Sequence, residues 1–567
     1  MNNTRNKYHK ACLLLAVFIV GLTSCNGDML DEDPKDFLTP GNAYSKPAYI
    51  DQGIIGLYQH VRLWWCTNAP TTAYMFTLAT DLSYYGENPG GGFMMNYQTN
   101  LSPTSTSGSI WNRNYSCIQK ANVVIEAVRN SDDEIWESEA QRNAFMAEAL
   151  FFRALAYEKL VVLFGDVPLV TEVFDYIKTD FTRSPRADIY KLMEEDLSFA
   201  VAHLPRKGAE KAPGRITQGA AWHLLSETYL IQSKFQDAVT AATHVIDDYG
   251  YALMTRRFGT KLGNDIFGAG DPYYDLFGYG NFNLTENTEG IWVIQVEPNI
   301  TGGESYPERA YGPAYYRMGN TPDGFTAFRG EFLDGSYTGY SDTLGECVAW
   351  NRPTNYVLYD IWGGGNWDKD QRNAEHNLKR SFYFDNPDSK YHGQKIDWSL
   401  YAPGQRSSPM NDTVQYIFPY FIKAAAPLEH FTSAARSGGG VNHKDVYAIR
   451  LAETYLIRAE AYLGLGQNEK AADDINVIRN RAEAIPVTAG EVTIDYILDE
   501  RARELYSEEW RVITLIRLGK LVERVRKYND NPLRPGLNIQ DHQNLWPIPQ
   551  TEIDRNVDGV LEQNPGY

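Results

Sequence analysis

The segment from Val446 to Gly519 constrains the fold most strongly, because its apolar residues recur at the three- and four-residue steps of an amphipathic helix. A first helix is predicted from Tyr447, Ile449, Leu451, Tyr455, Leu456, Ala459, Tyr462 and Leu463. Gly464 and Gly466 are expected to end this helix, and Asn468 is expected to cap a second one, whose inner face is supplied by Ala471, Ile475 and Ile478. The segment is therefore predicted to fold as an antiparallel helical hairpin.

A second copy of this hairpin begins 233 positions earlier in the chain. The aligned pairs are Trp222 with Tyr455, Glu227 with Glu460, Tyr229 with Tyr462, Leu230 with Leu463, Ala238 with Ala471, and Val245 with Ile478. A third hairpin is predicted from a helix that begins at Gln141 and a mate over Ile189 to His203. Repeat arrays need about three units to be stable, so these hairpins predict a tetratricopeptide-like scaffold. The alternative is that unrelated amphipathic helices align by coincidence.

The region between these hairpins has a different composition. From about Tyr251 to His443 it is rich in Gly, Pro, Asn and aromatic residues, with a strand predicted at Glu289 to Val296. A structureless loop of that length is improbable, so an irregular subdomain on the helical scaffold is expected, and such regions concentrate binding sites. The predicted fold class is mainly α, a tetratricopeptide-like helical repeat scaffold with a loop-rich irregular ligand-binding subdomain. The predicted divisions are a signal peptide (1–24), a tether (25–40), an N-terminal repeat region (41–250), the loop-rich subdomain (251–445), and C-terminal repeats with a signature tail (446–567).

The N-terminus has the form of a secretory signal. Arg5, Lys7 and Lys10 precede an apolar run from residue 11 to 22 that is too short to span a bilayer. The run ends in Leu-Thr-Ser-Cys, which resembles a bacterial lipobox, so Cys25 is predicted to carry lipid; the alternative is an ordinary cleaved signal. The remaining Cys66, Cys117 and Cys347 allow at most one disulfide, and no pair has metal-ligand spacing.

The charge balance excludes one class of partner. The formal net charge is -19, and removal of residues 1–24, which carry three basic and no acidic residues, would leave -22. Such a chain repels nucleic acid and anionic membranes, so no nucleic-acid partner is expected.

Several segments together resemble the SusD/RagB family of outer-membrane nutrient-binding lipoproteins. The resemblance is carried by Leu30-Asp31 and Pro34 and by the segments 147–170, 450–466, 500–519, 546–556 and 563–567. It implies four helical repeats packed against a loop-rich ligand face. It also implies a surface protein without enzymatic activity that captures oligosaccharides or other nutrients and lies as a lid over a TonB-dependent transporter of the SusC type. The acidic residues that follow Cys25 resemble signals that direct such lipoproteins to the outer face.

Two aromatic loop clusters are candidates for the ligand site. A sugar ring has an apolar C–H face and a polar rim, so its site needs an aromatic platform with a few amide, carboxylate or guanidinium groups. The first cluster comprises Asp81, Tyr84, Tyr85, Asn96 and Tyr97. The second comprises Trp362, Asn366 and Trp367, with Asp368, around a glycine triplet at 363–365. The alternative is that these rings only pack the loops onto the helices.

The remaining charged motifs favour structural roles. The turn with Asp370 and Arg372 matches no calcium loop and is predicted to form an ion pair. Asp499 with Arg503, and Glu508 with Arg511, have the spacing of solvated or interhelical salt bridges. No catalytic motif, metal site or cofactor-binding loop is recognised, so neither catalysis nor a cofactor is assigned. The open alternatives are a binding protein for a peptide or glycopeptide, a surface glycoside hydrolase, and a purely structural repeat scaffold.

Overall fold

The computed structural model describes residues 44–67, 77–92, 94–105, 107–260, 262, 265–298, 300, 303–329, 340–341, 343–406, 409–429 and 442–567. The predicted signal peptide, the lipidated Cys25 and the tether lie outside these residues. Among the residues described, no helix is both long and apolar enough to cross a bilayer. Cys66, Cys117 and Cys347 are buried and free, so the one disulfide that the sequence allowed does not form in this structure.

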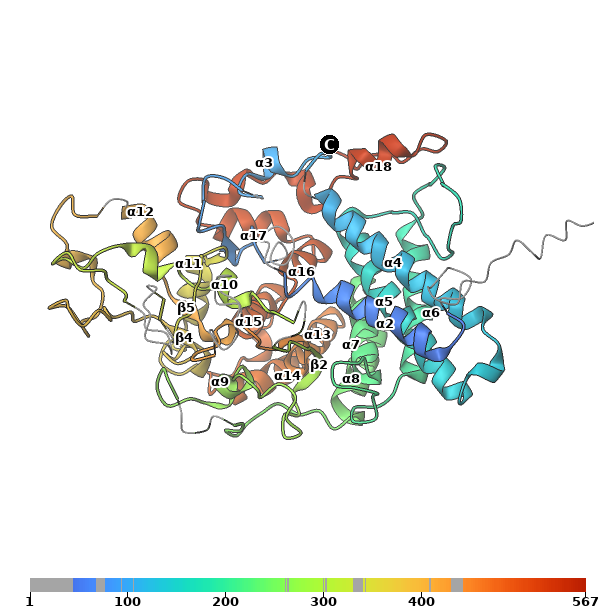
Figure 1. Cartoon of the computed structure of the whole chain (residues 1–567), viewed down its shortest axis with the longest axis horizontal. Coiled ribbons are helices and arrows are strands. Elements are labelled where there is room, and N and C mark those ends of the chain that lie inside the picture. The colour runs from blue at the N-terminus through green and yellow to red at the C-terminus, as the bar shows by residue number, and fades with distance from the viewer. Residues whose placement is uncertain are drawn as a thin grey trace, which may run out of the picture.

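Antiparallel helices packed in succession form the scaffold, which occupies the centre and right of Figure 1. The N-terminal helices are α2 (Pro47–Arg62), α4 (Ser107–Asn130), α5 (Glu139–Phe164), α6 (Arg186–His203), α7 (Gln218–Ile231) and α8 (Phe235–Asp248). The C-terminal helices are α13 (Leu451–Gly464), α14 (Asn468–Arg481), α15 (Ile494–Leu505), α16 (Arg511–Arg517) and α17 (Leu521–Tyr528). The mainly helical class and the three predicted hairpins are confirmed.

The two halves of the scaffold are one array. The bounds of α13 and α14 are those of α7 and α8 moved by 233 positions, so the predicted repeat is exact at the level of helix ends. Helix α8 packs against α13, although the chain between them runs through the whole loop-rich region. Apolar side chains fill this junction: Leu230, Ala238, Val239, Ile457 and Ala461. The chain therefore leaves the array after the α7–α8 hairpin, runs through the loop-rich region, and rejoins the array when α13 packs on α8.

A glycine sets how closely these two hairpins approach. Gly464 lies against the ring of Phe235 at the start of α8, and a methyl group at Gly464 would lie 2.7 Å from its ring carbons. Gly466, with φ +70°, ends the hairpin turn as predicted. The predicted cap is wrong: the N-cap of α14 is Gln467, and Asn468 is the first residue of the helix.

The start of the C-terminal hairpin differs from the prediction. Val446–Arg450 is strand β6, which pairs antiparallel with β2 (Gly290–Ile294), and helix α13 begins only at Leu451. Tyr447, Ile449 and Leu451 are spaced by two residues, which is the period of a strand, and the free edge of β2 supplies the hydrogen bonds. The predicted strand at Glu289 to Val296 is confirmed.

The loop-rich region, on the left of Figure 1, contains short elements around a second hydrophobic core. Its short helices and strands are α9 (Pro272–Leu276), α10 (Pro307–Tyr311), β3 (Arg352–Pro353), α11 (Asn355–Leu358), β4 (Leu378–Lys379), α12 (Pro409–Asn411) and β5 (Tyr420–Phe421). Strand β4 pairs with β5, and β3 pairs with β1 (Ser83–Tyr84) from the N-terminal part. Two further short helices, α3 (Tyr97–Asn100) and α18 (Gln550–Arg555), lie at the top of the view.

Buried ion pairs hold the loop-rich region on helix α15. Arg372 bonds Asp370 at 2.8 Å, as the sequence predicts, and also bonds Glu500 and Glu504 of α15 at 2.8 and 2.9 Å. Arg450 of β6 reaches Glu504 as well, at 2.6 Å. All of these side chains are almost fully buried, so each charge is compensated by several partners.

Neither ion pair predicted on this segment, Asp499 with Arg503 or Glu508 with Arg511, forms among the described residues, because other segments supply closer partners. Asp499 accepts a bond from Arg524 of α17, at 2.9 Å, and not from Arg503. Glu508 bonds Arg450 and Lys423, while Arg511 bonds Asp81.

Candidate functional site

The glycine-rich turn that follows α11 presents two aromatic rings to solvent. Tyr359 is 44% exposed and Trp367 is 42% exposed. Their rings are parallel to within 10°, with centroids 6.2 Å apart. We call these two rings the platform. Parallel exposed rings offer flat apolar surface, which suits the C–H face of a sugar ring.

The backbone of the turn keeps the platform in place. Gly364 and Gly365 have φ of +65° and +83°, a conformation that side-chain-bearing residues rarely adopt. Asn366 then fastens the turn to the helical array. Its Oδ1 accepts bonds from Arg479 at 3.0 Å and from the backbone N–H of Ile485 at 2.9 Å, and its Nδ2 donates to Gly363 at 3.1 Å.

The guanidinium of Arg380 orients both rings. Its central carbon lies 4.6 Å from the centroid of Trp367 and 5.3 Å from that of Tyr359. Its Nη2 donates to the carbonyl of Leu358 at 2.7 Å and to Asn373 at 2.6 Å, while its Nε and Nη1 are buried without a hydrogen-bond partner. Burial lowers the pKa of this guanidinium. Arg380 therefore supports the rings from the protein side by a cation–π contact.

Of the residues predicted in this cluster, Trp367 and Asp368 are exposed and can meet a ligand. Trp362 is fully buried in the second core, and its indole N–H donates to the carbonyl of Val357 at 3.0 Å. The prediction of ligand contact is corrected for Trp362, because a ring without exposed surface cannot stack on a ligand. Asn366 is half-buried and uses its amide to hold the turn, so it positions Trp367.

Part of the first predicted cluster gathers around Glu87. The Glu87 carboxylate accepts bonds from the Tyr85 hydroxyl at 3.0 Å, the Trp350 indole N–H at 2.9 Å and Arg317 at 2.9 Å. Tyr316 lies next to this group, with the Arg317 guanidinium 5.6 Å from its ring centroid. Burial, and then the Glu87 charge, raise the pKa of Tyr85, so its hydroxyl stays a donor. This Glu87 cluster combines the half-buried rings of Tyr85 and Tyr316 with a carboxylate and a guanidinium.

Three other residues of the first cluster are buried, and the prediction of ligand contact is corrected for them. Asp81 forms ion pairs with Arg511 and Arg524, Tyr84 packs in β1, and the Tyr97 hydroxyl donates to the carbonyl of Ala79 at 2.8 Å. Burial opposes ionisation of Asp81, but the two guanidiniums outweigh it and lower the pKa of its carboxyl. Burial raises the pKa of Tyr84 to about 12.

Asn96, the last predicted residue of this cluster, is half-buried. Its Oδ1 accepts a bond from Asn538 at 3.3 Å, and the hydrogen bonds to the Glu87 carboxylate in the described part of the chain come from other residues. The structure therefore brings Tyr85, but not Asn96, into the Glu87 cluster.

Several residues of both groups could not be chosen from the sequence. Tyr359 and Trp350 belong to the recurring aromatic residues of the loop-rich region, but nothing in their spacing separates exposed from buried rings. Glu87 meets Trp350 and Arg317 from more than 200 positions away, and a single sequence has no signal for such pairing. Among the residues described, no group of three or more His, Cys, Asp or Glu side chains is arranged to hold a metal ion.

Two family models match the chain. The model described as "SusD family" matches residues 351–567, and the one described as "Starch-binding associating with outer membrane" matches residues 28–230. Among curated proteins, the starch-binding protein SusD of Bacteroides thetaiotaomicron is 23% identical, over 99% of this chain and 100% of the relative. A SusD-like protein of Bacteroides ovatus is 25% identical, over 92% of this chain and 85% of the relative.

Solved structures have the same fold. A laminarin-binding SusD-like protein superposes with a TM-score of 0.64 and 23% identity, over 92% of this chain and 100% of the other. Surface glycan-binding protein A from Bacteroides thetaiotaomicron, in complex with laminarihexaose, gives a TM-score of 0.63 and 18% identity, over 91% of this chain and 99% of the other.

Proposed function

Because this chain belongs to the SusD family, we propose that it binds an oligosaccharide at the cell surface and delivers it to a transporter in the outer membrane. The observation that carries the proposal is the platform: Tyr359 and Trp367 are parallel, exposed, and supported from behind by Arg380. Two exposed rings side by side form an apolar patch, and such patches are typical of ligand-binding grooves. A purely structural scaffold would have these loop rings buried.

The chemistry of the platform supports a neutral glycan. Stacking on two rings uses the apolar face of a sugar, while polar groups on the same turn are available to its hydroxyls. Asp360 and Asp368 are both exposed beside the rings. With a formal charge of -19, the chain repels polyanionic glycans over most of its surface. The names of two similar proteins, one starch-binding and one laminarin-binding, support the same ligand class.

The Glu87 cluster is proposed as a second contact for the same ligand class. Tyr85 and Tyr316 offer ring surface, and Arg317, about a third exposed, offers donors to sugar hydroxyls. The carboxylate of Glu87 fixes the orientation of Tyr85 and Arg317, so a ligand would meet groups that are already in place. Asn96 stays a proposed contact, since its side chain is partly exposed.

The cellular setting is proposed from the sequence. Lipid on Cys25 would anchor the protein at the outer membrane, with which one family model associates its members by description. Several acyl chains on one residue give stable anchoring, because each buried methylene contributes about 0.8 kcal/mol. A TonB-dependent transporter of the SusC type is the proposed partner, and binding without catalysis is the proposed role. The alternative ligand is a peptide or glycopeptide, and a glycoside hydrolase is disfavoured because no catalytic motif is recognised.

Affinity electrophoresis tests the proposal. The purified protein is run in gels that contain one of a panel of plant, fungal and host polysaccharides, and the release of reducing sugar is assayed on the same samples. Retardation by one glycan, without release, is expected. Sugar release would contradict the non-enzymatic role. If no glycan retards the protein, the glycan assignment fails and peptide ligands become the next panel.

A further inference from the structure

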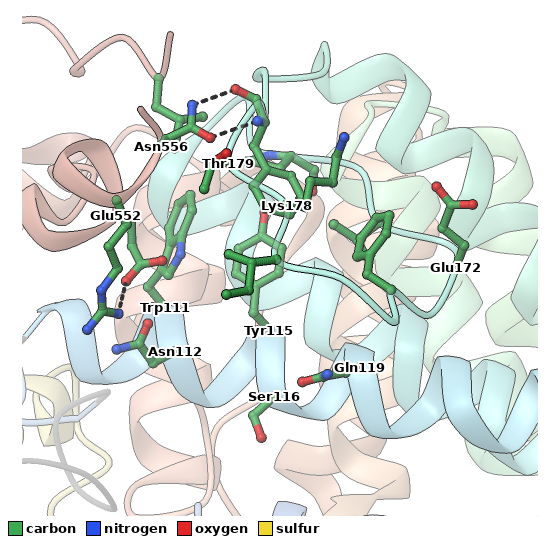
Figure 2. A pocket seen from close by; sticks show the side chains of 17 residues that line it. Trp111, Asn112, Tyr115, Ser116, Gln119, Glu172, Lys178, Thr179, Glu552 and Asn556 are labelled. Carbon is green, nitrogen blue, oxygen red and sulfur yellow. Dashed lines mark hydrogen bonds and ion pairs between the residues drawn. The ribbon is translucent and has the colours of Figure 1, made fainter. Parts of the chain in front are cut away.

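A pocket of about 550 Å³ lies far from the platform in sequence, between α4, the loop that follows α5 and the C-terminal segment (Figure 2). Four aromatic residues line it: Trp111, Tyr115, Phe174 and Phe181. In Figure 2 the rings of Trp111 and Tyr115 rise from neighbouring turns of α4 into the space below the loop. A volume of this size can hold a large side chain or a small ligand.

The pocket is held open by hydrogen bonds between its two loops. The Thr179 hydroxyl donates to Asp558 at 2.5 Å. The backbone N–H of Phe181 donates to Asn556 Oδ1 at 2.7 Å, and Asn556 Nδ2 donates back to the carbonyl of Phe181 at 2.8 Å. Figure 2 shows this reciprocal pair at the top of the pocket. Binding would therefore need little rearrangement of the backbone.

Apolar side chains project from the same two loops into solvent. Ile177, which lines the pocket, is 90% exposed, and Tyr176 beside it is 61% exposed. On the C-terminal loop Val557 is 75% exposed and Val560 is 71% exposed. Scattered single apolar residues are normal on a surface, but a group of four on two loops that are bonded to each other marks an interaction site.

The two loops at the rim of the pocket are acidic, although the charged side chains that line it directly balance, Glu172 and Glu552 against Lys178 and Arg555. The segment 172–181 has three acidic residues and one basic residue, and the segment 552–562 has four acidic residues and one basic residue. Both bases are already paired, Lys178 with Asp180 at 2.6 Å and Arg555 with Glu552 at 3.2 Å. The other five carboxylates have no ion-pair partner within the described part of the chain: Glu172, Asp175, Asp554, Asp558 and Glu562. An apolar pocket with this rim complements a cationic partner.

We infer that this pocket is a docking site for a basic peptide segment of a partner protein, which inserts one large apolar side chain between the rings of α4 and the loop. Lysine or arginine residues on both sides of that side chain face the unpaired carboxylates. The charge of the rim selects a peptide over a neutral sugar as the occupant, and the exposed apolar residues extend the contact beyond the pocket. This site is separate from the platform, so glycan binding does not depend on it.

Fluorescence anisotropy with a defined probe tests the inference. The probe is a fluorescein-labelled peptide, Gly-Lys-Lys-Phe-Lys-Lys-Gly, and two companions replace Phe by Ala or the four Lys by Glu. Saturable binding of the first probe is expected, with about tenfold weaker binding of the Ala probe and none of the Glu probe. Ile177→Ser in the protein is expected to weaken binding of the Phe probe about tenfold, and Glu172→Gln about two- to threefold.

The control is Ile55→Ser, which removes an isoleucine that is 50% exposed on α2, away from the pocket. This variant is expected to bind the probe as the unaltered protein does. The melting temperatures of all three variants should equal that of the unaltered protein, because each altered side chain is exposed. Equal binding of the Phe and Ala probes, or equal effects of Ile177→Ser and Ile55→Ser, would reduce the effect to bulk charge and overturn the inference. So would the absence of saturable binding.

Discussion

Asp81 and Arg511 are 430 residues apart in the sequence and form a bidentate ion pair in which neither side chain has exposed surface. Arg511 Nε and Nη2 donate to the two oxygens of Asp81 at 2.9 and 2.7 Å, and Arg524 Nε donates to Asp81 Oδ2 at 2.7 Å. Asp81 precedes β1 in the N-terminal part of the chain, whereas the arginines lie on α16 and α17. One carboxylate thus ties the first predicted aromatic cluster to the C-terminal helices.

Asp81→Ala is expected to destabilise the protein strongly, because it leaves two buried guanidiniums without their shared partner. Breaking a buried pair costs about 3 to 5 kcal/mol. The measurement is the urea midpoint of unfolding. The matched control is Asp541→Ala, which removes an exposed partner of Arg526 and should change the free energy of unfolding by less than about 1 kcal/mol. Similar midpoints for the two variants would contradict the structural role of Asp81.

Trp367→Ala is expected to weaken glycan binding about tenfold or more with a much smaller loss of stability than Trp362→Ala, because the ring is partly exposed and makes half of the platform. Trp367→Phe should keep part of the affinity. Trp362→Ala is the contrasting variant: it empties a fully buried site and should cost about 3 to 5 kcal/mol of stability. Gel retardation and thermal unfolding are measured on the same preparations. Unchanged retardation of Trp367→Ala would remove the platform from the site.

Asp445→Asn is expected to stabilise the protein at neutral pH. The Asp445 carboxylate accepts bonds from the backbone N–H of Val296 and from Asn283, each at 2.8 Å, and burial raises the pKa of this carboxyl from its ordinary 3.8 to about 6. A raised carboxyl pKa makes ionisation unfavourable to the fold. The cost is absent below pH 3.8 and reaches its full value, about 3 kcal/mol, above pH 6.

The asparagine variant does not ionise, so the gap between its melting temperature and that of the unaltered protein should widen from pH 4 to pH 7. A gap that does not change with pH would show that Asp445 does not titrate as expected.

Gly464→Ala is expected to strain the junction of the two repeated hairpins, because the new methyl group would lie 2.7 Å from ring carbons of Phe235. Overpacking costs about 1 to 3 kcal/mol, of which the better helix propensity of alanine returns up to about 1 kcal/mol. Gly490→Ala is the control, since a methyl group there meets nothing within 4 Å. The melting temperatures of the two variants are compared by thermal unfolding, and that of Gly464→Ala is expected to be lower. Equal melting temperatures would mean that the hairpins can separate without cost.

The helical scaffold was predictable because its signal is local. An apolar face at helical spacing, and a copy of that face 233 positions away, need no knowledge of what lies beside them. The first residues of the C-terminal segment, just before α13, show the limit of such a signal. Val446–Arg450 continues the apolar pattern but becomes a strand, because the free edge of β2 is adjacent only in the folded protein.

The residue types of the candidate site and the region of the chain that holds it were predictable, but which individual residues belong to it was not. Trp362 and Trp367 lie in the same glycine-rich turn, and one is buried in the second core while the other is on the surface. Tertiary contacts decide between them: Arg380 and Asn366 hold the turn so that Trp367 and Tyr359 face solvent.

The pairing of charged side chains also depends on tertiary contacts. The sequence by itself determined that acidic and basic residues alternate along the C-terminal helices, which predicts salt bridges. Only the tertiary structure decided the partners, because in a buried network each charge is satisfied by whichever opposite charge the packing brings within about 3 Å, and for Arg511 that partner is Asp81.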